Sequence, residues 1–91
     1  MVDLVSEESV PGRDDIEAAM LDLASGKKSR KEVSDWAYPW VYDDDLPEVE
    51  DELAWDALDL LTSADTQSSP GVYIFQKNDF QKWLNEFRRR R

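Results

Sequence analysis

Hydrophobic residues recur at helical spacing in four stretches of this chain, separated by polar segments and by segments with Pro and Gly. Apolar side chains three and four positions apart line one face of an α-helix, and that face must be buried against other elements. The pattern predicts a first helix over residues 13–25 and a second from Ser29 to about Val41. It also predicts a long third helix over residues 47–64 and a last helix over residues 79–88.

Local signals indicate where these helices begin and break. Ser29 and Glu32 have the spacing of a capping box, which places the start of the second helix. Pro39 lacks an amide hydrogen, so we expect the second helix to kink there or to stop just before it. Asp45, with a proline two residues later, predicts the cap of the third helix.

The segments between the helices are short. Residues 72–75 are β-branched and aromatic, which predicts one extended segment, with no partner strand evident in the sequence. Residues 66–71 have the composition of a loop, and residues 1–12 are predicted to form an extended or frayed arm. A chain of 91 residues supports only one core. We therefore expect a single, mainly α domain over residues 1–91, a compact bundle of about four helices.

Charge bears on function more than on fold. The chain has 21 acidic and 11 basic residues, a net charge of −10, and four of the basic residues form a tail at residues 88–91. An acidic body repels phosphate backbones and anionic membranes and attracts cationic partners. The sequence therefore predicts a basic protein partner, no direct nucleic-acid binding and no membrane binding. No signal-peptide pattern and no long apolar run occurs, which predicts a cytoplasmic protein.

The composition leaves few groups for catalysis. Histidine and cysteine are absent, which removes imidazole bases, thiolate nucleophiles and the usual zinc ligands. The acidic run that starts at Asp43 does not fit a calcium-binding loop, because Ala54 stands where the bidentate glutamate is required. We therefore expect a protein that is not an enzyme and holds no cofactor and no metal.

The densest functional signal is an acidic run that contains a tryptophan. Residues 43–59 include nine acids and no base, and a helical wheel places Trp55 among the acids on the solvent side of the third helix. Such a surface is typical of docking to a basic protein, with carboxylates that steer the encounter and an aromatic anchor. The alternative is that Trp55 packs under another helix and the acids maintain solubility. The predicted partner-binding residues are Asp43, Asp44, Asp45, Glu48, Asp51, Glu52, Trp55, Asp56 and Asp59.

The tryptophan-bearing segments carry a resemblance to known proteins. Residues 29–37 (SRKEVSDWA), Trp40, Val41 and residues 79–84 (DFQKWL) resemble segments of a set of short bacterial proteins of unassigned function. The resemblance covers about residues 13–87 and implies no activity. In size, acidity and helical build the chain is also similar to small immunity proteins, which inhibit bacterial nuclease toxins.

These observations lead to one hypothesis and two alternatives. The hypothesis is a non-catalytic acidic protein that binds a basic partner, as a bacterial immunity-type inhibitor of a toxin does. The first alternative is a self-associating structural or regulatory subunit, in which basic residues 27–31 dock on the acidic helix of the next copy in a salt-sensitive homodimer. The second is a DNA mimic, whose carboxylates occupy the groove of a DNA-binding protein.

Overall fold

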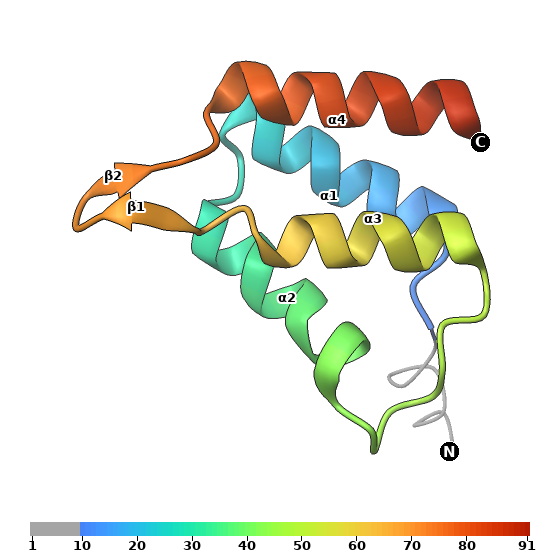
Figure 1. Ribbon diagram of the computed structural model, residues 1–91. Coiled ribbons are helices and arrows are strands. Elements are labelled where there is room, and N and C mark those ends of the chain that lie inside the picture. The colour runs from blue at the N-terminus through green and yellow to red at the C-terminus, as the bar shows by residue number, and fades with distance from the viewer. Residues whose placement is uncertain (1–9) are drawn as a thin grey trace.

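The computed structural model describes residues 10–91, in which four helices pack together and a small β-hairpin projects from one end (Figure 1). The helices are α1 (Arg13–Ser25), α2 (Arg30–Tyr42), α3 (Glu52–Thr62) and α4 (Lys77–Arg90). The strands are β1 (Gln67–Ser69) and β2 (Val72–Tyr73). The prediction of a mainly α fold with about four helices is confirmed. Most of the predicted N-terminal arm, residues 1–9, lies outside the described residues.

Helix α1 organises the core, because it contacts each of the other three helices, most extensively α4. Helices α2 and α3 pack along each other as a second pair. The residues that are buried between these helices are almost all hydrophobic. They are Ile16, Ala19, Met20, Leu23, Val33, Ala37, Val49, Ala54, Ala57, Leu58, Leu61, Ala64, Phe80, Leu84 and Phe87.

The start of α2 agrees with the sequence prediction. Ser29 Oγ accepts a hydrogen bond from the Glu32 amide at 3.1 Å, and Glu32 Oε1 accepts one from the Ser29 amide at 2.9 Å. The helix does not stop before Pro39, however. It continues to Tyr42, and the Asp43 amide donates to the Pro39 carbonyl at 2.8 Å. A proline inside a helix removes one backbone hydrogen bond, and burial of the α2 face offsets this loss.

The predicted start of the third helix is wrong. Helix α3 begins at Glu52 rather than at Pro47, and Asp51, not Asp45, is its N-cap. Residues 43–51 form the connection from α2 to α3. Val49 belongs to this connection and is nevertheless buried, at 7% exposure. A buried side chain and a capping carboxylate outweigh the weaker preference of a proline for a first helical turn.

The segment around residues 72–75 does have a partner strand. Val72 and Tyr73 pair antiparallel with Ser69 and Gln67, in the stretch predicted to be only a loop. Gly71 supplies the positive φ of +80° that the tight turn requires. Strand β1 was missed because its residues are polar and exposed, so no hydrophobic alternation marks them.

The last helix is longer than predicted. Helix α4 begins at Lys77 and continues to Arg90, with Gln76 as its N-cap. Asp79 Oδ2 accepts a hydrogen bond from the Gln76 amide at 2.8 Å. Within residues 10–91, none of the helices has the length and apolar character needed to cross a membrane.

Candidate functional site

The structure divides the predicted acidic site between two elements. Asp43, Asp44, Asp45 and Glu48 lie on the connection from α2 to α3, whereas Glu52, Trp55, Asp56 and Asp59 lie on α3. The single acidic helix face of the sequence analysis therefore does not form, because α3 starts five residues later than predicted.

Asp51 is occupied by structural contacts. Its carboxylate accepts two hydrogen bonds from Arg13, from Nε at 2.8 Å and from Nη2 at 3.1 Å, and another from the Leu53 amide at 3.1 Å. The Arg13 guanidinium, supported by the amides of Ala54 and Leu53, holds the pKa of Asp51 below its ordinary value. This acid was predicted to lack a neutralising partner, and the partner lies 38 residues earlier in the chain.

Trp55 is neither fully buried nor free. Its residue exposure is 38%, and it lines a shallow hollow of about 330 Å³ together with Trp40 and the connection from α2 to α3. Asp43, Asp44 and Glu48 line the same hollow. The predicted grouping of a tryptophan with acids is therefore present, but the acids around it come mainly from the connection.

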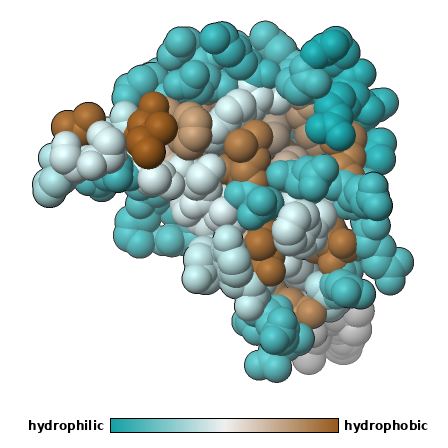
Figure 2. All heavy atoms as spheres, in the orientation of Figure 1, coloured by the Kyte–Doolittle hydropathy of each residue, from teal (hydrophilic) through white to brown (hydrophobic). Residues whose placement is uncertain are grey.

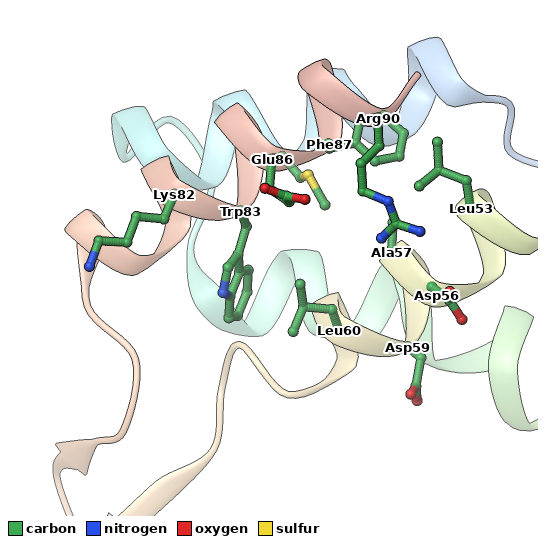
Figure 3. Close-up of a pocket in the computed structure, with 11 residues that line it drawn as sticks. Leu53, Asp56, Ala57, Asp59, Leu60, Lys82, Trp83, Glu86, Phe87 and Arg90 are labelled. Carbon is green, nitrogen blue, oxygen red and sulfur yellow. The ribbon is translucent and has the colours of Figure 1, made fainter.

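Asp56 and Asp59 lie at a separate groove of about 550 Å³ between α3 and α4 (Figure 3). Figure 3 shows Trp83 extending from α4 toward Leu60 of α3, and Arg90 extending from the same helix toward α3. The groove has an apolar floor and a rim with charges of both signs. Its lining residues are Met20, Leu53, Asp56, Ala57, Asp59, Leu60, Lys82, Trp83, Glu86, Phe87 and Arg90. Across residues 10–91, no three acidic side chains converge in a way that could hold a metal ion.

Two of the four arginines in the basic tail pair with acids of α1. Arg88 Nε lies 2.7 Å from Glu17 Oε2, and Arg91 lies 2.7 Å from Glu17 Oε1 and 2.8 Å from Asp14 Oδ1. Hydrogen bonds from Arg88 and Arg91 lower the pKa of Glu17. These arginines thus join the end of α4 to the start of α1.

A second group of cations gathers at the opposite end of α4. We use the name basic end for Lys27, Lys28, Arg30, Lys31 and Lys77, which come from the α1–α2 turn, the start of α2 and the start of α4. The α1–α2 turn and the start of α4 lie close together. A Cβ atom added to Gly26 in the turn would be only 3.0 Å from Lys77 Nζ. Lys28, Arg30 and Lys77 line one hollow of about 590 Å³.

The lysines of the basic end are exposed and only partly paired. Lys31 Nζ lies 2.7 Å from Asp35 Oδ2, which raises the pKa of Lys31, and Lys28 lies 3.9 Å from Asp22. Lys27 and Lys77 form no ion pair with any residue from 10 to 91. Exposed ion pairs contribute little to stability, so the paired lysines can exchange partners at low cost.

Arg30 attaches the basic end to the hairpin. Its Nη2 donates a hydrogen bond to the Phe75 carbonyl at 3.1 Å, and its guanidinium lies 4.2 Å from the centroid of the Tyr73 ring. Beyond this attachment the hairpin projects from the helices, and Figure 2 shows hydrophobic side chains on it. Val72 and Ile74 are 52% and 50% exposed.

The sequence analysis identified residues 27–31 as basic and gave them a role only in the self-association alternative, without Lys77. The link to Lys77 is tertiary, since 46 residues separate Lys31 from that lysine, and no local pattern reports it.

Comparisons with known proteins bear directly on function. Residues 7–87 match the model of a family described as YxzC DNA-binding protein. Over 65 residues the chain is 43% identical to "Uncharacterized protein YxzC" of Bacillus subtilis (strain 168), which corresponds to 71% of this chain and 52% of that protein. The chain thus spans about half the length of this curated relative. No solved structure matches the chain.

The family description contradicts the predicted function. We expected an immunity-type inhibitor that docks a basic protein without contacting nucleic acid, and a family of DNA-binding proteins conflicts with both statements. The DNA-mimic alternative conflicts as well, because a mimic replaces DNA. The comparisons give no support to a protein partner or to a salt-sensitive homodimer. The error was to argue from net charge, which ignores how charges are distributed over the surface. The match over residues 7–87 shows that the chain belongs to the YxzC DNA-binding protein family.

Proposed function

We propose that this protein binds duplex DNA through the basic end. The observation that carries the proposal is the family description, taken together with five cations from three elements on one end of the molecule. Lysine and arginine side chains bind DNA by neutralising phosphates and releasing condensed counterions. The basic tail is less suited to this role, because Arg88 and Arg91 already pair with Glu17 and Asp14.

The acidic remainder of the molecule limits the affinity. With a net charge of −10, the chain repels DNA in every orientation except one that presents the basic end. Four exposed lysines at that end, each contacting a phosphate, give a slope of about −3.6 for log K against log salt. Affinity then falls roughly a hundredfold between about 50 and 200 mM salt.

The proposed DNA binding also implies a role without catalysis and a cytoplasmic location. Binding through lysines and phosphates requires no reacting group, which fits a chain without histidine or cysteine and a role that is not enzymatic. Since bacterial chromosomal DNA lies in the cytoplasm, we place the protein there.

The test is the fluorescence anisotropy of a labelled DNA duplex, titrated with the protein at several salt concentrations. Lys27→Gln and Lys77→Gln remove the two lysines of the basic end that form no ion pair within residues 10–91. Each variant should weaken binding and reduce the salt slope by about 0.9, because one phosphate contact is lost.

Lys82→Gln is the matched control. Lys82 is an exposed lysine of α4 that lies at the groove rather than at the basic end, and this substitution removes the same charge. Its affinity and salt slope should equal those of the wild type. Absence of duplex binding by the wild type at about 50 mM salt would overturn the proposal. An equal loss in Lys82→Gln and Lys27→Gln would overturn the assignment to the basic end.

A further inference from the structure

We propose that the β-hairpin enters the major groove of DNA and places Val72 and Ile74 against thymine methyl groups. This inference rests on the proposed DNA binding, and it adds which groove and which base groups of the duplex the protein contacts.

The hairpin is fixed to the body at its base. Arg30 donates to the Phe75 carbonyl and stacks on the Tyr73 ring, and the Ile74 amide donates to the Thr66 carbonyl at 3.1 Å. Gln67 Oε1 accepts a hydrogen bond from the Gly71 amide at 2.8 Å, which closes the turn. A projecting element held at its base and at its turn can be presented to a partner with little loss of conformational entropy.

The exposed hydrophobic side chains point away from the body. Successive side chains of a strand alternate between its two faces. Tyr73 faces Arg30, so Val72, the other residue of β2, lies on the opposite face, where it is 52% exposed. Ile74 directly follows the strand and is 50% exposed. Ser69 is the partner of Val72 in the ladder and is also exposed. The hairpin and the residue that follows it therefore present two exposed, branched hydrophobic side chains.

The width of the hairpin favours the major groove. Paired strands lie about 4.8 Å apart, and their side chains widen the ribbon further. The major groove of B-DNA is about 12 Å wide and admits a two-stranded ribbon, whereas the minor groove is only about 6 Å wide. The C5-methyl group of thymine is the hydrophobic feature of the major groove, and branched aliphatic side chains can contact it.

Charge identifies DNA, rather than another protein, as the occupant of this surface. The base of the hairpin adjoins Arg30, which donates to the Phe75 carbonyl, and Lys77 begins α4 two residues after Phe75. A ribbon in the major groove has phosphates on both sides of it. Cations beside the hairpin base can contact those phosphates and hold the ribbon in place.

The experiment compares two duplexes of identical A·T-rich sequence, one with thymine and the other with uracil, which differ only in the C5-methyl groups. The wild type should bind the thymine duplex about fourfold more tightly for each methyl group that it buries. The double variant Val72→Thr/Ile74→Thr keeps the β-branched shape that the strand requires but replaces hydrophobic groups with hydroxyls. It should bind both duplexes with the affinity that the wild type has for the uracil duplex.

The salt slope separates the two proposals. The double variant should keep the wild-type slope, because its lysines are unchanged, and circular dichroism should show wild-type helix content. Leu21→Gln, at an exposed leucine of α1, is the control and should discriminate between the duplexes as the wild type does. Equal binding of both duplexes by the wild type with a normal salt slope would overturn the hairpin inference alone. Displacement by a minor-groove ligand such as netropsin would also overturn it, and absence of DNA binding would overturn both proposals.

Discussion

At the scale of single residues, Asp51 combines a local and a long-range contact in one carboxylate. It caps α3 through the amides of Leu53 and Ala54, and it also binds Arg13 at the start of α1. The connection from α2 to α3 is therefore held to the N-terminal end of the core at the point where α3 begins. Asp51, which we predicted to be part of an exposed docking surface, instead connects the start of α3 to the start of α1.

We predict that Asp51→Asn destabilises the protein at neutral pH but not in acid. The pKa of Asp51 is lowered below its ordinary value of 3.8, so its ionised form stabilises the fold. This contribution is complete above that value and is lost as the pH falls through the lowered pKa of the folded state. Thermal unfolding followed by circular dichroism should show a Tm a few degrees below wild type at pH 7, and the difference should narrow as the pH falls below 3.8.

Asp44→Asn is the control for this prediction. Asp44 is exposed on the same connection and forms no hydrogen bond or ion pair with the other residues from 10 to 91. Its Tm should follow that of the wild type at every pH. A deficit of Asp51→Asn that stays constant with pH would contradict an electrostatic role, and the cap alone would then explain it.

At the scale of elements, the main difference between prediction and structure is the rotation and start of α3. On a helical wheel of residues 46–64, Leu46 and Val49 shift the centre of the apolar face toward Leu60. In the structure those two residues precede α3. Leu58 and Leu61 are completely buried, whereas Leu60 is 36% exposed at the groove beside α4.

The pair Leu58→Ala and Leu60→Ala tests this rotation. Removal of the fully buried Leu58 side chain leaves a cavity and should lower the free energy of unfolding by about 3 kcal/mol. Leu60 already contacts water, so its truncation should cost less than about 1 kcal/mol. Urea denaturation monitored by tryptophan fluorescence gives both values. Equal losses, or a larger loss at Leu60, would show that α3 is rotated as the sequence pattern suggested.

The features that the sequence predicted correctly are those encoded locally. The capping box of Ser29 and Glu32, the core face of α1 and the helical spacing in α4 depend on residues within a few positions of each other. The start of α3, strand β1 and the basic end depend on distant partners: Arg13 for Asp51, Tyr73 for Gln67, and Gly26 for Lys77. No periodicity in the sequence records these contacts. For that reason the fold class was predictable and the candidate site was not.

At the scale of the whole molecule, the two basic clusters differ in what surrounds them. In the tail, Arg88 and Arg91 form ion pairs with Asp14 and Glu17 of α1, so these two charges are neutralised within the protein. The basic end retains exposed lysines and adjoins the projecting hairpin. Net charge alone could not distinguish these clusters, although they lie at opposite ends of α4 and have different neighbours.

We predict that the double variant Arg88→Gln/Arg91→Gln affects folding but not DNA binding. Loss of the contacts to Glu17 should lower Tm, because α4 is then less firmly attached to α1. The salt slope for a DNA duplex should stay at the wild-type value, since these arginines do not face the DNA in the proposed orientation. Both quantities come from melting curves and anisotropy titrations of the same preparations. A slope reduced by about 1.8 would mean that the tail contacts two phosphates, and the DNA interface would then lie at the tail end of α4.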